Sequence, residues 1–363
     1  MCIALLTTSH PKYALIAIDN RDEYILRPTS KPHWWTTLAS SPSSSKQVKV
    51  EVLSSRDLQR AEHGTWLGIT KGGNFAVLTN YRETNIHDAA HPVRGKRSRG
   101  GIVTAWLAAD PEESTESFTR RMVESGDVKG VGGFSLICGK LRRAKGAQEL
   151  EPLAILSNRH DHKDHVPWIC GKRGHVYGLS NATYIRNEDD EPLWPKIQKG
   201  SDALARTVAE AVEKNFSEQE LQDALFKILD TDDFPSNHGM DLEEGIPLLK
   251  HTIFVPAFGD PEHQREMQEA RVSGKPELTE DGPAGEQLPG QPDTSVSGYQ
   301  TGLYGTQRQT LVLVDWDGNV SYVERALYDN NGNTIPRGQG DAKFTFKVDG
   351  WDSESEREVE SRL

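Results

Sequence analysis

MCIALLTTSHPKYALIAIDNRDE, residues 1–23, contains two short apolar runs, and a run of polar residues follows the second. The apolar runs at 3–7 and 13–19 are rich in β-branched or aromatic side chains, which predicts two strands. Asn20, Arg21, Asp22 and Glu23 come next. Four polar residues in series cannot all face a core, because an isolated buried charge is costly. They form either an exposed turn or an ordered charge network at a site.

Strand-like runs recur towards both ends of the chain, and helical patterns lie mainly between them. Further strands are predicted at 75–79, 134–138, 153–157, 175–179, 310–314 and 320–324. Helices are predicted at 102–109, 113–125, 201–214 and 217–230, and the last begins with a capping box from Ser217 to Glu220. This order suggests a layered α+β domain.

Polar segments define the expected domain organisation. With 363 residues, the chain could form one large domain or two ordinary ones, and we expect a single domain over 1–350. A Ser-rich loop at 39–49 and a stretch rich in Pro, Gly, Asp and Glu at 275–298 interrupt it, and the second predicts disorder. Residues 351–363 contain five acidic residues and two arginines, which predicts a disordered acidic tail.

Composition and charge exclude several classes of protein. A formal net charge of −12 argues against nucleic acid as a partner. No apolar stretch approaches the roughly 18 residues that predict a membrane span, and the start lacks the basic residues of a secretory signal. Cys2, Cys138 and Cys170 match no disulfide framework or zinc pattern, so we expect a reducing compartment.

Four apolar runs end in asparagine, at Asn20, Asn80, Asn158 and Asn181. An amide at a strand end supplies a donor and an acceptor on a rigid support, which suits an oxyanion or ligand contact. Alternatively, each asparagine starts a turn, because its side chain mimics turn hydrogen bonding. Convergence of these residues near one rim would favour the first interpretation.

Cys2 is a candidate nucleophile. Removal of Met1 is usual when a small residue follows, and Cys2 would then carry an α-amine that titrates near ~7.7–8 and a thiol that titrates near ~8.5. One residue would hold both a nucleophile and its own general base. In most proteins, however, a cysteine after the initiator methionine has no function.

Several short motifs resemble, in order, those of the NRDE family, also called the transport and Golgi organisation 2 family. They are MCI (1–3), NRDE (20–23), GTWLG (64–68), TNYR (79–82), SRG (98–100), GLSN (178–181), WPK (194–196), YGT (304–306) and QT (309–310). The resemblance implies an N-terminal-nucleophile-hydrolase-like αββα sandwich of two mainly antiparallel sheets. It also implies a role in lipid or acyl-coenzyme A homeostasis and haem mobilisation, with Golgi organisation downstream.

The same motifs resemble, more distantly, the choloylglycine hydrolase and penicillin acylase branch of N-terminal-nucleophile enzymes. That resemblance implies that Cys2 is the nucleophile, oriented by Arg21 and Asp22. Asn80 and Asn181 would then bind the oxyanion or the substrate amide.

A late arginine, Arg308, would hold charge near the nucleophile, and Asn20 and Glu23 would contact the ligand. The order Thr-Gln-Arg-Gln-Thr at 306–310 departs from the expected Thr-Arg-Thr-Gln-Thr. A shift by one position reverses the direction of a side chain on a strand.

A basic segment precedes the first predicted helix, at Arg94, Lys96, Arg97 and Arg99. Basic side chains next to free backbone N–H groups suit a phosphate, which favours a ligand such as acyl-coenzyme A; a solvated loop is the alternative. The stretch HDHKDH at 160–165 could ligate a metal but is more typical of an exposed hairpin, so we expect no metal site. No motif for covalent or thiolate haem attachment is present, and no cofactor is expected to be required.

The last residues, Ser361, Arg362 and Leu363, are a close variant of the Ser-Lys-Leu address that a peroxisomal import receptor reads. We therefore expect a cytoplasmic protein that is not secreted, with peroxisomal, Golgi-associated or mitochondrion-associated locations as alternatives. Three functions stay open. They are a handler of lipid, acyl-coenzyme A or haem, a Cys2-dependent hydrolase of a linear amide or thioester, and a non-catalytic scaffold in Golgi organisation or secretion.

Overall fold

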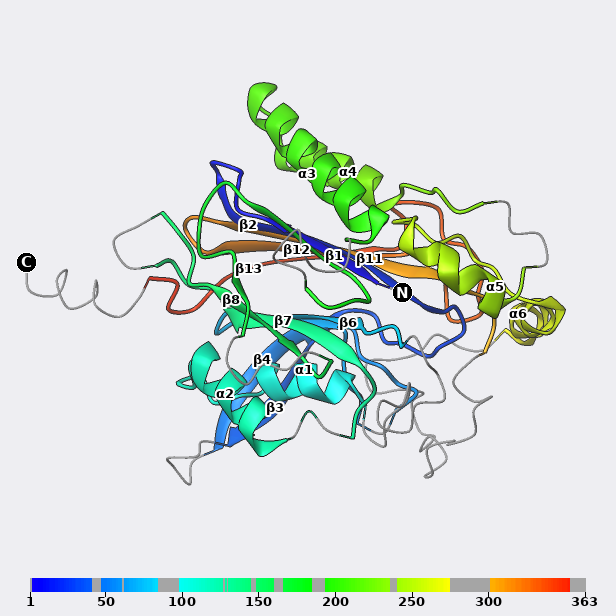
Figure 1. The fold of residues 1–363 in the computed structure, drawn as a ribbon, viewed down its shortest axis with the longest axis horizontal. Helices are drawn as coiled ribbons and strands as arrows, with labels where there is room; N and C mark the ends of the chain where they lie inside the picture. Colours follow the sequence, from blue (N-terminus) through cyan, green and yellow to red (C-terminus); the bar gives the residue numbers. More distant parts are fainter. Residues whose placement is uncertain are drawn as a thin grey trace, which may run out of the picture.

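Two β-sheets lie face to face between two layers of helices in the computed structural model of the chain (Figure 1). The structure describes residues 2–40, 47–60, 62–83, 98–126, 128, 130–144, 148–159, 166–184, 193–235, 240–274 and 301–352. This is the αββα sandwich that the resemblance implied, and the strand pairs within both sheets are antiparallel.

The first sheet has six strands in the order β10-β1-β2-β11-β12-β13. These strands are β1 (Ile3–Thr7), β2 (Tyr13–Tyr24), β10 (Val176–Leu179), β11 (Tyr304–Asp315), β12 (Asn319–Ala326) and β13 (Asp341–Lys347). The N-terminal strand β1 therefore lies between β10 and β2, and both neighbours hold its backbone. This pairing fixes the position of the residue immediately before β1.

The second sheet has seven strands in sequence order. They are β3 (His33–Ser40), β4 (Gln47–Ser54), β5 (Leu67–Thr70), β6 (Asn74–Asn80), β7 (Phe134–Lys140), β8 (Leu153–Ser157) and β9 (Trp168–Ile169). Apolar side chains from both sheets, such as Leu15 and Phe75, form the core between them.

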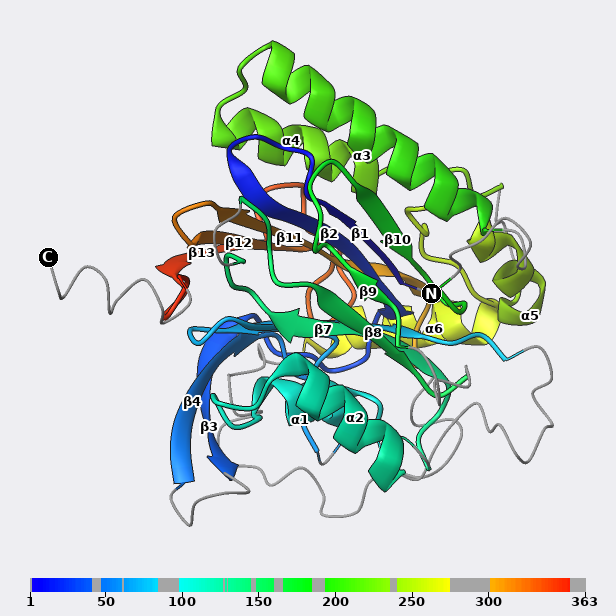
Figure 2. The same cartoon turned by 60° about the vertical axis from the view of Figure 1, so that its left-hand side comes forward.

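Helices cover the outer face of each sheet. Figure 2 shows α3 (Pro195–Glu213) and α4 (Glu218–Leu229) across the first sheet, with α1 (Gly100–Leu107) and α2 (Thr115–Ser125) under the second. The short helices α5 (Leu242–Gly245) and η1 (Ile246–Lys250) and the longer α6 (Pro261–Ser273) follow α4. The predicted capping box of α4 is confirmed, with hydrogen bonds in both directions between Ser217 and Glu220. Among the described helices, none combines the length and the apolar character that a membrane span needs.

Two polar segments are shorter than the sequence indicated. β3 and β4 pair as far as Ala39 with Val48 and Ser40 with Gln47, so parts of the expected loop at 39–49 belong to strands. At the other end, Trp351 is 3% exposed and its indole nitrogen donates to the carbonyl oxygen of Trp316 over 2.8 Å. The packed core therefore extends past residue 350. The stretch predicted at 275–298 and the tail beyond residue 352 lie outside the described residues.

Candidate functional site

Cys2 immediately precedes β1 and is buried by the elements around it, with 2% of its surface exposed. Its backbone carbonyl oxygen accepts hydrogen bonds from Ser180 Oγ over 2.8 Å and from Lys196 Nζ over 3.4 Å. Ser180 follows β10 and Lys196 lies in the first turn of α3, so a sheet edge and a helix both hold the main chain of residue 2.

Burial raises the pKa of the Cys2 thiol to about 12. The thiol is therefore protonated at neutral pH in the chain that retains Met1. A nucleophilic role needs a base that removes this proton, because the thiolate is the reactive form.

Asn80 and Asn181 meet where the two sheets approach each other. Asn80 ends β6 in the second sheet, and Asn181 follows β10 in the first sheet. The side-chain amide of Asn181 donates to the backbone carbonyl oxygen of Asn80, and Thr79 Oγ1 donates to the carbonyl oxygen of Ser180 over 2.7 Å. The hydroxyl of Ser180 in turn bonds to Cys2, so both asparagines lie near the candidate nucleophile.

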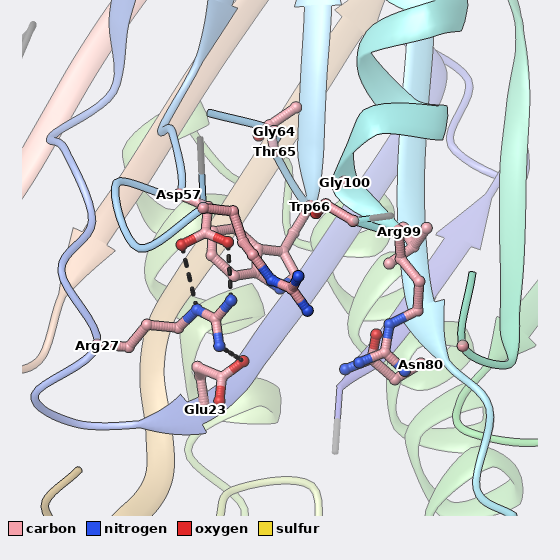
Figure 3. A pocket seen from close by; sticks show the side chains of 13 residues that line it. Glu23, Arg27, Asp57, Gly64, Thr65, Trp66, Asn80, Arg99 and Gly100 are labelled. Carbon is pink, nitrogen blue, oxygen red and sulfur yellow. Dashed lines mark hydrogen bonds and ion pairs between the residues drawn. The ribbon is translucent and has the colours of Figure 1, made fainter. Parts of the chain in front are cut away.

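A cavity of about 60 Å³ adjoins Asn80 (Figure 3). Glu23, Trp66 and Arg99 contribute to its wall. Arg99 Nη1 donates to the carbonyl oxygen of Gly133 over 3.3 Å, and burial lowers the pKa of Arg99 to about 10, against the opposing effect of Glu23. Arg99 therefore remains a cation at neutral pH and gives the cavity an anchor for a negatively charged group.

Arg27 fixes one side of this cavity. Its guanidinium makes two hydrogen bonds to the carboxylate of Asp57, at 2.8 and 3.2 Å, and approaches Glu23 at 3.5 Å (Figure 3). Two parallel bonds between an arginine and a carboxylate define the orientation of both groups. Glu23, expected as a ligand contact, thus lies at the cavity with one oxygen already near a cation.

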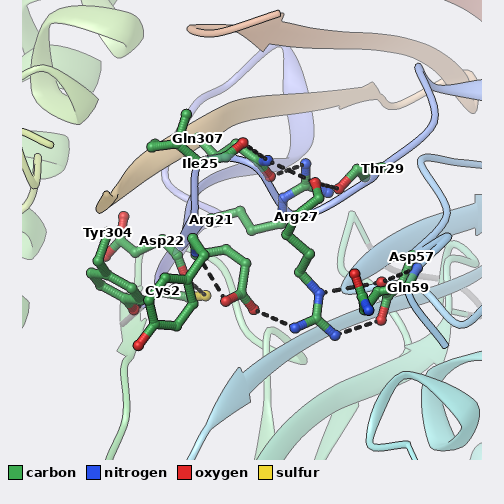
Figure 4. A network of polar contacts seen from close by, with 12 residues as sticks. Cys2, Arg21, Asp22, Ile25, Arg27, Thr29, Asp57, Gln59, Tyr304 and Gln307 are labelled. Atoms are coloured by element: carbon green, nitrogen blue, oxygen red, sulfur yellow. Dashed lines mark hydrogen bonds and ion pairs between the residues drawn. The ribbon is translucent and has the colours of Figure 1, made fainter. Parts of the chain in front are cut away.

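The polar run after the second apolar segment forms an ordered charge network (Figure 4). Asp22 Oδ1 accepts a hydrogen bond from Thr306 Oγ1 over 2.7 Å, and its backbone oxygen lies 4.0 Å from Cys2 Sγ. Arg21 Nη2 donates to Gln307 Oε1 over 3.0 Å, and its guanidinium lies 4.5 Å from the centre of the Trp66 ring. The exposed-turn alternative is therefore wrong, because Arg21 is 4% exposed and Asp22 is 2% exposed.

Asp19 adds a second buried carboxyl group to this network. Burial and the neighbouring Asp22 carboxylate raise the pKa of Asp19 to about 8, although Arg21 and Lys196 oppose the shift. Burial also raises the pKa of Asp22. Two carboxyl groups close together in an apolar surrounding cannot both ionise easily, so this network can hold a proton near neutral pH.

Asn20 does not join the site. Its side-chain nitrogen donates to the carbonyl oxygens of Leu229 over 2.8 Å and Ile253 over 3.0 Å, which anchors the helical layer to β2. Neighbouring residues on a strand face opposite sides of the sheet, which directs Asn20 to the helical layer, and the ligand contact implied for it stays a prediction. Asn158 is structural as well, since its Oδ1 accepts from the backbone nitrogen of Phe134 over 3.0 Å.

Arg308 lies apart from the cavity at Asn80. The pairing of β11 with β2 shifts between Thr306 and Arg308, so Gln307 is an extra residue in a β-bulge. Gln307 takes the contact with Arg21, while Arg308 Nε lies 3.8 Å from Glu324 Oε1 and lines two other cavities. These contacts place Arg308 at the two other cavities, and the role implied for it beside the nucleophile stays a prediction.

Several sequence predictions fall on residues that the structure does not describe. These are Arg94, Lys96 and Arg97 of the basic segment, the stretch at 160–165, and the C-terminal residues Ser361, Arg362 and Leu363. Within the described ranges, no group of three or more His, Cys, Asp or Glu side chains is placed to hold a metal ion.

Lys196 is the main site residue that the sequence interpretation missed. It is fully buried, and burial lowers its pKa against the opposing effects of Asp22, Cys2 and Asp19. A signal was available, because α3 begins at Pro195 and its buried face continues through Gly200 and Leu204 at helical spacing. A lysine on the apolar stripe of a helix indicates a buried partner.

Comparison with known proteins identifies a family. Residues 1–329 match the Transport and Golgi organisation 2 family. A human protein, Transport and Golgi organization protein 2 homolog, is 28% identical over 88% of each chain. An uncharacterised protein of Saccharomyces cerevisiae is 23% identical over 96% of this chain and 100% of its own length.

A solved structure of a variant of the conjugated bile acid hydrolase of Clostridium perfringens has a TM-score of 0.40 and 9% identity, covering 96% of this chain and 97% of that one. The family match covers most of the chain and includes the motifs around Cys2, Asp22, Asn80 and Asn181. The chain belongs to the Transport and Golgi organisation 2 family.

Proposed function

We propose that the chain, once Met1 is removed, uses Cys2 to cleave an amide or a thioester. The observation that supports this proposal is the convergence of separate segments on one edge of the sandwich. Cys2 Sγ lies 4.0 Å from the backbone oxygen of Asp22, and Ser180 links Cys2 to the edge where Asn80 and Asn181 meet. These residue types supply a nucleophile, a carboxylate and amide donors, which acyl transfer requires.

The proposed reaction begins at the new N-terminus. The α-amine of Cys2 accepts the thiol proton, and Sγ attacks the carbonyl carbon of the substrate. The bond to the leaving amine or thiol breaks, and the leaving group takes the proton from the α-amine. Water then attacks the S-acyl group, which releases the carboxylic acid and restores the thiol. Met1 must be absent, because an amide nitrogen at residue 2 cannot act as the base.

The surroundings of Cys2 support this order of events. Ser180 and Lys196 hold the carbonyl oxygen of residue 2, which fixes the main chain that carries both the thiol and the amine. A thiol whose pKa is raised to about 12 is unreactive until a base lies next to it. Removal of Met1 would supply that base as the free α-amine of Cys2.

The proposed substrate carries negative charge close to the scissile bond. Arg99 is a cation at the cavity beside Asn80, and no carboxylate bonds to it among the described residues. An acyl-coenzyme A or an anionic lipid amide would meet this requirement. The described residues that line the cavity include no histidine, cysteine, methionine or tyrosine, so they offer haem no axial ligand.

The second candidate function is a carrier that binds the same anionic acyl ligand without cleaving it. The observation that favours it is the buried, protonated Cys2 thiol, which is inert if Met1 is retained.

The location of the protein is also a proposal. Its family is named for Golgi organisation, which favours a site of action at the cytoplasmic face of that organelle, and a binding assay with a peroxisomal import receptor tests Ser361, Arg362 and Leu363.

A thiol-release assay distinguishes the two functions. The chain is produced with Cys2 as its first residue, from a cleavable fusion, and is incubated with acetyl- and palmitoyl-coenzyme A. The hydrolase predicts release of free coenzyme A, abolished in Cys2→Ala and kept in Cys138→Ala, which removes another buried thiol. Saturable binding with no release by the processed chain would support the carrier instead.

A further inference from the structure

Two adjoining cavities have volumes of about 380 and 260 Å³, and Arg27 lines both the larger of them and the cavity beside Asn80. Their walls share Thr29, Arg308 and Tyr328, so they form one double cavity. The larger part has an apolar wall that includes Ile25 and Leu58. Small-molecule sites usually have volumes of about 300–1,000 Å³ and a mostly apolar lining with a few polar groups.

Arg308 is the polar group that distinguishes this double cavity. Its side chain is almost fully buried, with 9% of the residue exposed, and it lines both parts. No hydrogen bond from its guanidinium to any described residue is present, and its Nε is a buried donor without a partner. A buried guanidinium that lacks hydrogen bonds is destabilising, and an anionic ligand that accepts them removes the penalty.

The nearest described carboxylate does not remove this penalty. Glu324 Oε1 lies 3.8 Å from Arg308 Nε, beyond hydrogen-bond distance. Glu324 is already engaged, because Ser55 Oγ donates to Oε1 over 2.5 Å and Tyr322 donates to Oε2 over 3.2 Å. The guanidinium therefore has donors available for a ligand in the cavity.

We propose that the double cavity binds a small monocarboxylate with an apolar body, with its carboxylate on Arg308 and its body against Ile25 and Leu58. The planar guanidinium fork matches a carboxylate, which it can bind through two parallel hydrogen bonds. Glu324 and Asp329 also line the cavity. Their charges disfavour a dianion such as phosphate, so a monoanion is the better fit.

This double cavity is separate from the cavity beside Asn80, and Gln307 connects it to the charge network around Asp22 through Arg21. Gln307 lines the larger part of the double cavity, and its side-chain nitrogen donates to the carbonyl oxygens of Ile25 over 3.1 Å and Arg27 over 3.3 Å. Its oxygen accepts from Arg21. The inference goes beyond the proposed function, since binding here requires neither Met1 removal nor turnover.

Calorimetric titration with octanoate tests the proposal on the full chain, with octanamide as the uncharged probe of the same length. Wild-type protein is expected to bind octanoate saturably at one site. Arg308→Met, which keeps much of the apolar stem, is expected to weaken octanoate binding by at least about tenfold and to leave octanamide binding nearly unchanged. Arg173→Met changes an arginine outside the cavity and is expected to match wild type.

A second variant covers the case in which Arg308→Met fails to fold. Ala270→Phe fills the larger part from α6 without changing charge, and is expected to abolish binding of both probes. The proposal is overturned if wild-type protein does not bind octanoate in the millimolar range. It is also overturned if folded Arg308→Met binds octanoate as tightly as wild type, or if Ala270→Phe leaves the affinity for octanoate intact.

Discussion

The side-chain amide of Asn181 donates a hydrogen bond to the backbone carbonyl oxygen of Asn80, and this bond joins the two sheets near Cys2. Thr79 makes a second link to the carbonyl oxygen of Ser180 over 2.7 Å. The two asparagines therefore belong to one local structure although 101 positions separate them in the sequence. The geometry of the candidate site depends on how these strand ends are joined.

Loss of the second link should loosen this junction. Thr79→Val keeps the shape of the side chain and leaves the carbonyl oxygen of Ser180 without its donor. We expect the free energy of unfolding to fall by about 1–3 kcal/mol, because the oxygen is buried. Chemical denaturation measures the change, and Thr104→Val, which removes a bond within α1, is the control with a smaller expected effect. Equal losses in the two variants would argue against a special role for the junction.

Lys196 should be essential for stability as well as for the site. Lys196→Met removes a buried cation and leaves Asp22 and Asp19 with less compensation. We expect a loss of about 3–5 kcal/mol at neutral pH, since breaking a buried charge pair leaves an uncompensated charge. Lys199→Met, in a more exposed position of α3, is the control. A variant at Lys196 as stable as the control would show that the surrounding carboxyl groups do not need its charge.

The two carboxyl groups should make stability depend on pH. The pKa of Asp19 in the folded chain is raised from 3.8 to about 8, so the folded state holds this proton more tightly than the unfolded state. Its contribution is complete below about pH 3.8 and is lost as the pH rises towards 8. Relative to Asp19→Asn, wild-type protein should therefore lose stability over this range, by at most about 1.4 kcal/mol per pH unit. Parallel stability curves for the two proteins between pH 5 and pH 8 would contradict the raised pKa.

Arg99 should select negatively charged ligands at the cavity beside Asn80. Arg99→Met is expected to raise the Kd for acyl-coenzyme A by about tenfold and to reduce its dependence on salt, because the lost interaction is between charges. Equilibrium binding at two salt concentrations measures both effects. Arg143→Met, far from the cavity and paired with Asp352, is the matched control. An unchanged salt dependence in Arg99→Met would exclude Arg99 as the anion contact.

The apolar runs predicted eight of the strands, because they are short and closed by turn residues, whereas the two-sheet sandwich was implied by the family resemblance. The sequence interpretation missed β3, β4, β5, β9 and β13, where polar residues alternate with apolar ones, as in β4, or where the strand is short, as in β5 and β9. The alternation of side chains along β2 explains why Asn20 bonds to the helical layer while Arg21 lies between the sheets. The sequence motif alone does not show which of these side chains faces which side of the sheet.

The position of Arg308 could not be predicted for a different reason. A bulge at Gln307 changes which side of the sheet the following side chains face. A bulge forms where two strands pair, and these strands are distant in the sequence. Lys196 was missed because its partners are Cys2 and two carboxyl groups of β2, which only the folded chain brings to α3.

The measurement that tests the central proposal most directly is the mass of the intact protein after reaction with an acyl thioester. The chain that begins at Cys2 is mixed with palmitoyl-coenzyme A, quenched with acid and weighed, and the modified residue is mapped by peptide analysis. The proposed function predicts an acyl adduct on Cys2 that decays at neutral pH and is absent in Cys2→Ala. A processed, ligand-saturated protein whose Cys2 stays unmodified throughout would contradict it.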